Sequence, residues 1–345
     1  MILALEVSTV GTKEQLLMLF ENNKGVFFSG EDIAEKLSIS RTAVWKSVKS
    51  LRNDGYNIEA VRNKGYCLSV KTDILSVQGI QKYLQPVCSN IQLNVLHTLN
   101  STNTLAREKA MAGAPDGYTV IANSQTNGRG RGGRTFYSPS DTGIYMSLIL
   151  RPCHYSSQQA VKLTTMAAVA ACEAIEAVSE EKAQIKWVND IYVGEKKVCG
   201  ILTEASFGLE DGFLEYAVLG IGINVYPPAD GFPNEIKDIA GTVFSEEQSD
   251  GKNHLAAEFL NRFMTYYSIP QDTNYVDNYR SRSLVIGKEI QVIFSDCTKK
   301  AVALDIDKEC RLIVQYEDGK IESLYSGEIS IIFGTDCRQC QTALI

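Results

Sequence analysis

The sequence of 345 residues contains no hydrophobic run long enough to cross a membrane. Its apolar start, Met1–Leu5, is short and carries no positive charge, so it does not resemble a secretory signal. Positive charge is not in excess either, because the formal net charge is −7. A chain that binds nucleic acid over its whole surface would be basic. These absences predict a cytoplasmic protein with no membrane partner.

Nine cysteines are scattered through predicted elements, and their number is odd. This favours reduced thiols in the core over a disulfide framework. The hydrophobic and charged fractions, 44% and 22%, are those of an ordinary globular protein. The length suggests about two or three domains.

The stretch from Gln125 to Pro139 interleaves glycines with three arginines. Glycine visits positive φ freely, so such a loop can fold closely around a bound group and is expected to be mobile when empty. Arginine holds carboxylate or phosphate oxygens in bidentate fashion. An RG-rich linker or nucleic-acid-binding tail is the alternative, but the stretch lies in mid-chain between two apolar runs. We therefore interpret it as an anion-binding loop.

Residues 29–53 predict a short capped helix, a tight turn at 38–40 and a second helix from Arg41 to about Asn53. Residues 56–70 alternate like a β-hairpin around 63–65. This is the order of a winged helix-turn-helix, in which the second helix enters the major groove. Val44, Trp45, Val48 and Leu51 are expected on its inner face. The candidate DNA-binding residues are Ser40, Arg41, Thr42, Lys46, Lys49, Arg52, Arg62 and Lys64.

A small helical docking domain without a DNA role is the alternative for this segment. Residues 1–75 hold ten Lys or Arg against nine Asp or Glu, so the local positive surplus is small. Two copies of such a module would be needed to read two half-sites.

Residues 91–283 mix predicted strands and helices, which indicates an α+β fold around a mixed sheet. Strands are expected at 91–96, 118–123, 143–151, 183–188 and 213–224, with a hairpin at 190–204. Helices are expected at 101–113, 157–178 and 254–269. Beyond residue 283, five short strands suggest a small β-barrel, followed by a disordered tail.

Four further segments are polar where packing alone would favour apolar residues. Ser101-Thr102-Asn103 begins a helix and suits a polar ligand or an anion, although a plain helix N-cap is the simpler reading. The segment 186–190 ends a strand with a cation, an amide and a carboxylate. Lys197 begins an apolar hairpin strand and is either a site residue or a solvated turn lysine. Two strand glycines precede Asn224 and usually mark the close approach of a ligand or backbone.

Together these segments resemble the biotin–protein ligases, in the bifunctional form that also represses the biotin operon. The matching pieces are Ser101-Thr102-Asn103, the loop 128–139, Lys186-Trp-Val-Asn189-Asp190, Lys197-Val-Cys-Gly200-Ile-Leu-Thr-Glu204 and Gly220-Ile-Gly222-Ile-Asn224. The resemblance implies a winged helix-turn-helix (1–75), a catalytic domain similar to class II aminoacyl-tRNA synthetases (76–283), an SH3-like barrel (284–334) and a tail (335–345).

The resemblance implies two steps: biotin and MgATP form biotinoyl-adenylate, and a lysine of a biotin carboxyl carrier domain then takes the biotin. The implied catalytic residues are Lys197, Arg129, Arg131, Asp190 and Asn189. The implied biotin-binding residues are Ser101, Thr102, Asn103, Gln125, Gly128, Arg129, Arg131, Lys197, Gly200, Gly220 and Gly222. The implied adenylate-binding residues are Arg131, Phe136, Lys186, Asn189, Lys197 and Asn224. No dedicated metal site is expected, and Mg²⁺ would arrive with ATP.

The adenylate would also be the corepressor, and it would favour a homodimer that binds operator DNA. A ligase whose winged helix has no regulatory role is the alternative, as is a biotin sensor that has lost ligation. Four residues depart from the pattern of these ligases: Gly132, Thr135, Phe136 and Val188. We expect weaker stacking from Phe136 than from the frequent Trp.

Overall fold

The computed structural model describes residues 11–152, 155–208, 212–269, 274–294, 297–325 and 327–331. The expectations for residues 1–10 and for the tail, with Cys337 and Cys340, lie outside this part. Within it, no helix has the length and hydropathy that a membrane span requires. The described residues divide into two compact units, one formed by those up to residue 83 with 247–254 and the other by the rest.

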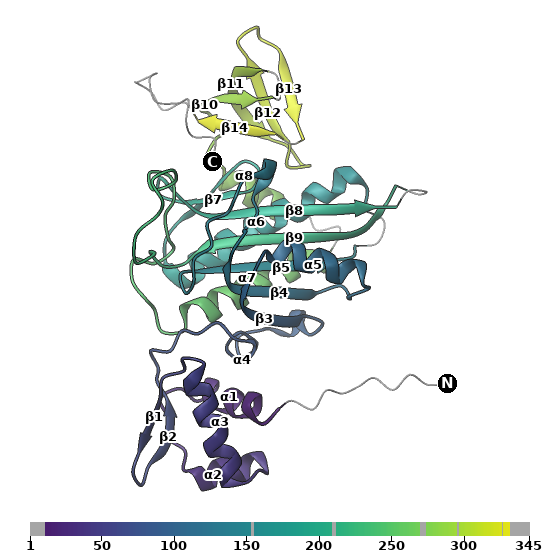
Figure 1. The fold of residues 1–345 in the computed structure, drawn as a ribbon. Helices are drawn as coiled ribbons and strands as arrows, with labels where there is room; N and C mark the ends of the chain where they lie inside the picture. Colours follow the sequence, from purple (N-terminus) through teal and green to yellow (C-terminus); the bar gives the residue numbers. More distant parts are fainter. Residues whose placement is uncertain are drawn as a thin grey trace, which may run out of the picture. The chain divides into compact units, whose positions relative to one another are not determined.

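The first unit is a winged helix-turn-helix, as the sequence predicts (Figure 1). The Ser29 hydroxyl accepts from the Asp32 N–H and the Asp32 carboxylate accepts from the Ser29 N–H, so the second helix begins with a capping box. Its elements are α1 (Thr12–Glu21), α2 (Gly30–Leu37), α3 (Arg41–Asn53), the antiparallel pair β1 (Ile58–Val61) and β2 (Gly65–Leu68), and α4 (Val77–Gln81).

The prediction that Trp45 faces inward is wrong. Val44, Val48 and Leu51 follow the spacing of one helix face and fill the core, whereas the Trp45 side chain is 53% exposed. Trp45 lies one position along the helix from Val44 and therefore about 100° away from that apolar stripe. Its ring lies 5.4 Å from the Lys49 ammonium nitrogen on the exposed side of α3.

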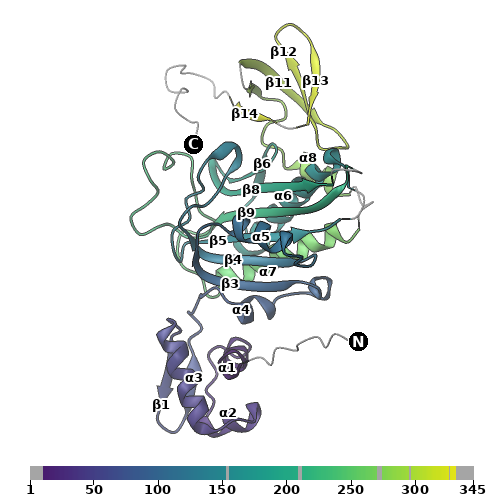
Figure 2. The same ribbon diagram turned by 45° about the vertical axis from the view of Figure 1, so that its right-hand side comes forward.

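The second unit is built on a seven-stranded sheet of order β3-β4-β5-β9-β8-β7-β6, in which β3 and β4 are parallel and every other pair is antiparallel. Figures 1 and 2 show β3, β4, β5, β9 and β8 side by side in this order. The strands are β3 (Gln92–Leu99), β4 (Tyr118–Gln125), β5 (Gly143–Leu150), β6 (Ala183–Lys186), β7 (Asp190–Val193), β8 (Lys196–Phe207) and β9 (Leu214–Asn224). The predicted α+β mixed sheet is confirmed.

Two helices cover opposite faces of this sheet. From α5 (Thr102–Met111), Asn103 bonds the Glu204 side chain, and from α6 (Ser157–Ser179), Thr164 bonds that of Thr203. Neighbouring side chains of a strand point to opposite faces, so α5 lies on the Glu204 face and α6 on the other. The remaining helices are α7 (Gly251–Tyr267), α8 (Asn274–Ser281) and the short 3₁₀ turns η1 (Pro86–Cys88) and η2 (Arg131–Gly133).

The five C-terminal strands form one antiparallel sheet of order β13-β12-β11-β10-β14. They are β10 (Glu289–Ile293), β11 (Thr298–Ile306), β12 (Leu312–Tyr316), β13 (Ile321–Leu324) and β14 (Glu328–Ile331), close to the five predicted strands. The Trp187 indole N–H donates to the Cys310 carbonyl oxygen at 3.1 Å, so this sheet is tied to the segment that follows β6.

Candidate functional site

The Gly/Arg loop is folded back on itself after β4. The Gln125 N–H donates to Ser138 O, Phe136 N–H to Gly128 O and Gly130 N–H to Arg134 O, at 3.1, 2.9 and 2.8 Å. These bonds make a narrow hairpin whose tip is η2. The hairpin carries its arginines across a pocket on the α5 face of the sheet.

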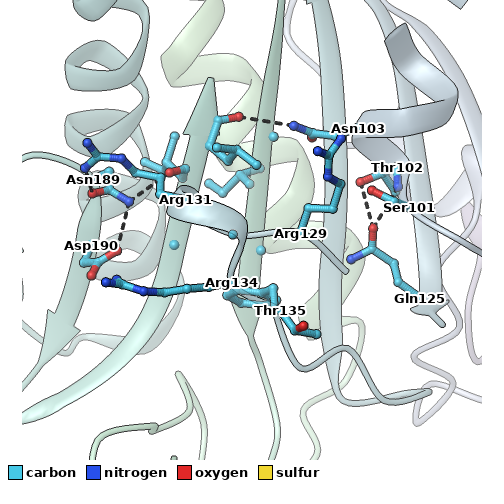
Figure 3. Close-up of a pocket in the computed structure, with 18 of the residues that line it drawn as sticks. Ser101, Thr102, Asn103, Gln125, Arg129, Arg131, Arg134, Thr135, Asn189 and Asp190 are labelled. Carbon is cyan, nitrogen blue, oxygen red and sulfur yellow. Dashed lines mark hydrogen bonds between the residues drawn. The ribbon is translucent and has the colours of Figure 1, made fainter. Parts of the chain in front are cut away.

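The pocket gathers most of the predicted site residues (Figure 3). Its lining includes Ser101, Thr102, Asn103, Gln125, Arg129, Arg131, Phe136, Asn189, Asp190, Lys197, Gly200, Gly220 and Gly222. Three predicted residues are not among its lining: Gly128 lies in the hairpin, Lys186 on β6, and Asn224 lines a second cavity. Seven further residues line the pocket that were not named as site residues, although the first three belong to the predicted anion-binding loop: Gly130, Arg134, Thr135, Ile201, Leu202, Ile221 and Glu328.

One end of the pocket holds a cationic network. The Arg131 guanidinium donates to Asn189 Oδ1 at 2.8 Å, and the Asn189 amide donates to Asp190 Oδ1 at 3.0 Å. The Lys197 Nζ lies 2.8 Å from the same Asp190 oxygen. Lys197 is therefore a pocket residue, and the reading as a solvated turn lysine is wrong. This end can stabilise negative charge on a bound group.

Lys186 adds a further cation beside this end, because it lies opposite Asp190 in the backbone register of β6 and β7. Burial lowers the pKa of the Lys186 ammonium below its ordinary value; Asp190 opposes this shift and Lys197 adds to it. An approaching anion would favour its charged form.

The other end of the pocket is polar and mostly neutral. Gln125 Oε1 accepts from the Thr102 N–H at 2.8 Å and lies 3.1 Å from the Thr102 hydroxyl oxygen. Ser101 stands at the N-cap position of α5, but its side chain makes no capping bond. The plain N-cap reading is therefore wrong, because Gln125 supplies the capping oxygen and leaves the Ser101 hydroxyl at the pocket. Figure 3 shows these three residues on the side opposite Asn189 and Asp190.

Two glycines in the strands that line the pocket lie in close contact with other side chains of the protein. A Cβ on Gly220 would lie 2.1 Å from Asn103 Oδ1, and a Cβ on Gly222 would lie 2.5 Å from the Phe136 ring. The close approach predicted at these glycines is therefore that of Asn103 and Phe136. Phe136 lines both the pocket and the second cavity, as do Thr135 and Lys197, so the two adjoin at these residues.

The second cavity, of about 80 Å³, is more apolar. Phe232, Ile236, Ile239 and Ala240 line one side, and Asn224 supplies an amide whose N–H donates to Gly241 O at 3.1 Å. Such a lining suits a flat aromatic group that also needs an edge contact.

The C-terminal sheet contributes to the pocket through Glu328, which forms a short ion pair with Arg134. Arg131 also donates to the Gly327 carbonyl oxygen at 3.4 Å. Nothing in the local sequence of β14 distinguishes Glu328 from an ordinary surface residue, so sequence reasoning had no signal for it.

In the first unit, most of the predicted DNA-binding side chains are exposed, on α3 or in the turn between β1 and β2. These are Arg41, Thr42, Lys46, Lys49, Arg62 and Lys64. Ser40 caps α3, since its hydroxyl accepts from the Ala43 N–H at 3.1 Å. Arg52 donates to Ile58 O at 2.9 and 2.6 Å, so its guanidinium also ties α3 to the wing.

Among the described residues, no group of three or more His, Cys, Asp or Glu side chains is arranged to hold a metal ion.

A helix-turn-helix unit joined to an α+β domain with a cation-rich pocket is the architecture expected of an enzyme that carries a second, DNA-related module. Comparison with known families agrees. Residues 95–224 match the biotin/lipoate A/B protein ligase family, residues 12–67 an HTH domain, and residues 285–331 the biotin protein ligase C-terminal domain.

The bifunctional ligase/repressor BirA of Bacillus spizizenii is 38% identical over 92% of this chain and 98% of its own length. The protein of that name from Escherichia coli is 27% identical over 92% and 96%. A biotin protein ligase from Aquifex aeolicus, solved with biotin and ATP, superposes with a TM-score of 0.59 at 26% identity, covering 70% of this chain and 98% of that one. The chain belongs to the bifunctional ligase/repressor family of biotin–protein ligases.

Proposed function

We propose that the pocket joins biotin to ATP and then passes biotin to a lysine of a carboxyl carrier domain. A biotin carboxylate oxygen attacks the α-phosphorus of ATP and pyrophosphate leaves. The carrier amine then attacks the carbonyl carbon of the adenylate, and AMP leaves. One observation carries this assignment: a cationic network and a neutral polar network lie at opposite ends of a single pocket.

The cationic end suits the phosphates. Arg131 and Lys197 are preorganised there, and such donors stabilise charge that grows on phosphoryl oxygens in the transition state. Mg²⁺ would arrive with ATP, and the side-chain oxygens of Asn189 and Asp190 would be ligands that this hard cation accepts. The second cavity is the place for adenine, with Phe136 against its face and Asn224 at its edge.

The neutral end suits the ureido ring of biotin, which needs donors and acceptors in a dry pocket. Ser101, Thr102 and Gln125 provide them. The Gly/Arg hairpin would then cover the adenylate and exclude water from it until the carrier docks. Asp190 is the candidate to orient the carrier lysine and accept its proton.

The first unit supports the repressor role. We propose that it binds operator DNA, that the adenylate is the corepressor, and that adenylate binding favours a homodimer in the cytoplasm. The exposed cations of α3 and the wing suit phosphate contacts. Exposed Trp45 adds an aromatic surface beside Lys49.

Pyrophosphate exchange into ATP tests the ligase assignment. The wild-type chain should exchange only when biotin is present. Lys197→Ala should lower the rate about 10²- to 10³-fold, the loss typical of removing one charge-stabilising donor. Lys182→Ala replaces an exposed lysine directly before β6; this variant is the matched control and should exchange normally. Exchange by Lys197→Ala at the wild-type rate would refute the role of Lys197.

A gel shift with DNA from upstream of biotin genes tests the repressor assignment. Binding should require biotin and ATP, and Lys46→Ala with Lys49→Ala should weaken it for all sequences and reduce its salt dependence. Active ligation without any adenylate-dependent shift would favour a ligase with a non-regulatory winged helix. Sedimentation with and without biotin and ATP tests the dimer, and equal monomer fractions would overturn it.

A further inference from the structure

Glu204, on β8, links α5 to Arg129 of the Gly/Arg hairpin beside the neutral end of the pocket. Its Oε2 accepts from the Asn103 amide at 2.8 Å, and its Oε1 lies 3.3 Å from the Arg129 guanidinium. One carboxylate thus holds a residue of α5 with one oxygen and a residue of the hairpin with the other. It is the only ion-pair partner of Arg129 within the described ranges.

The sheet register explains why Glu204 reaches these partners. Gly200, Leu202 and Glu204 alternate along one face of β8, and β9 places Gly222, Gly220 and Val218 opposite them. Because Gly220 has no side chain, Asn103 lies over the sheet there and approaches Leu202 O at 3.5 Å. Glu204 lies one step further along the face, where the Asn103 amide meets it.

The orientation of Asn103 follows from its two neighbours. Its Oδ1 lies 2.6 Å from the Ser147 hydroxyl oxygen, and its N–H₂ group faces the Glu204 carboxylate. A hydroxyl can donate to the amide oxygen, whereas a carboxylate can only accept. Ser147 also lies 2.8 Å from the Thr102 hydroxyl oxygen, so Glu204, Asn103, Ser147 and Thr102 form one connected network.

This network continues to the far end of the hairpin. Thr102 contacts Gln125, whose N–H₂ donates to the Ser138 hydroxyl at 2.9 Å, and Ser138 donates to Phe136 O at 2.9 Å. Both ends of the hairpin are therefore tied to the same polar network, one through Gln125 and Ser138 and the other through Glu204 and Arg129. The cationic end at Asn189 and Asp190 has its own, separate bonds.

We propose that Glu204 is a positioning residue for biotin: it holds Arg129 over the neutral end of the pocket and fixes the amide of Asn103 beneath it. Arg129 consequently belongs to the biotin end, while Arg131 and Lys197 serve the phosphates. This inference rests on the proposed function for the identity of the ligand. It predicts that Glu204 affects the binding of biotin and leaves that of ATP alone.

Two measurements on the full chain test this proposal: titration calorimetry with biotin alone, and pyrophosphate exchange with biotin or MgATP varied. Glu204→Ala should weaken biotin binding and raise its KM about tenfold or more, as expected for losing bonds to a charged group. The KM for ATP should stay within about twofold. Glu204→Gln keeps an oxygen for Asn103, so its defect should be smaller.

The coupling to Arg129 separates positioning from a general structural role. In an Arg129→Ala background, the ion pair is already absent, so Glu204→Gln should add little. Glu215→Gln is the control, because Glu215 lies on neighbouring β9, outside the pocket, and accepts from the Ser206 hydroxyl at 3.1 Å. It should behave as wild type in both assays.

Several outcomes would overturn the proposal: unchanged biotin affinity in Glu204→Ala, equal rises in both KM values, or additive effects of Glu204→Gln and Arg129→Ala. A wild-type chain that binds biotin but catalyses no exchange would refute the ligase function alone. The calorimetric comparison would still decide the role of Glu204. A wild-type chain that binds no biotin would refute both.

Discussion

Two clusters of charge in this molecule are built on opposite plans. In the first unit, Glu21, Lys24, Asp250 and Lys82 form a closed ring, which we call the charge ring. Lys24 lies 3.2 Å from Glu21 and 2.9 Å from Asp250, and Lys82 pairs with Glu21 at 2.8 Å and with Asp250. Opposite charges alternate around it, and the four side chains are nearly buried.

The pocket of the second unit is not balanced in this way. In and beside it, the described residues include five cationic side chains and three carboxylates. The cations are Arg129, Arg131, Arg134, Lys186 and Lys197, and the carboxylates are Asp190, Glu204 and Glu328. Buried charge that only supports a fold is compensated within the chain. An uncompensated surplus indicates a site where a ligand supplies the missing negative charge.

The glycines of the two units also differ in whether they serve packing or the pocket. A Cβ on Gly79 in α4 would lie 2.6 Å from the Asn253 amide, and one on Gly222 would lie 2.5 Å from the Phe136 ring. Asn253 is buried and bonds Ser76, Ile74 and Asp250, so it cannot move away easily. Phe136 stands on the hairpin. Equal close approaches therefore serve packing in one unit and a binding surface in the other.

Removing Asp250 should have the largest effect on stability. Asp250→Ala leaves Lys24 and Lys82 with Glu21 alone, and breaking a buried pair typically costs about 3 kcal/mol. Hydrogen exchange of peptides from α1 and α4 in the full chain should show opening that is easier by about that amount. Pyrophosphate exchange at the pocket should not change.

The matched control is Lys13→Ala, which removes an ion pair with Asp54 in the same unit. Both of its side chains are more than a third exposed, so its loss should cost about 0–1 kcal/mol. If Asp250→Ala and Lys13→Ala showed equal protection from hydrogen exchange, the buried charge ring would contribute no more to stability than the surface ion pair, which would contradict this prediction.

The fold was largely predictable because its signals are local. The capping residues at Ser29, the apolar stripe of α3 and the turn at 63–65 each depend on neighbours in sequence. Where two adjacent apolar residues compete for one face, the pattern was insufficient, and Trp45 was placed on the wrong side. Helix α8 was missed because its short, polar sequence resembles a loop.

The site was predictable where polar residues stand next to the ends of apolar strands, as at Asn189, Asp190 and Lys197. Glu204 ends one of the matching segments but was assigned no role, and Glu328 was not singled out. The reason is physical, because their partners lie far along the chain: Arg129 and Asn103 for Glu204, and Arg134 for Glu328. The cap of α5 was misassigned for the same reason, since Gln125 lies 23 positions from Thr102. Such contacts exist only after the sheet register is formed.

Gly222→Ala tests whether the pocket glycine serves binding rather than stability. The added methyl group would push Phe136 and the hairpin out of place, and misplacement by about 1 Å can cost about 10²-fold in rate. We expect a loss of about 30-fold in kcat/KM for biotin in pyrophosphate exchange, with little change in Tm. Gly79→Ala should give the reverse, a lower Tm with normal exchange. If the two variants changed Tm and exchange rate in the same way, the two glycines would not differ in role.

Acid should weaken the charge ring. We expect a smaller loss of stability from it than from Asp250→Ala or Gly79→Ala. Burial alone would raise the pKa of the Asp250 carboxyl, but hydrogen bonds from Lys82 and Lys24 outweigh it and hold that pKa below its usual value. A carboxyl whose pKa is depressed by folding contributes stability above its unfolded pKa, about 4, and loses it as the pH falls through the folded value. Between pH 5 and pH 3, the Tm measured by circular dichroism melting should therefore fall further in the wild type than in Asp250→Asn. The difference between the two decreases should be about 2 °C or more. If the Tm falls by the same amount in both proteins, Asp250 is not the group that titrates, and the ring keeps its charge in acid.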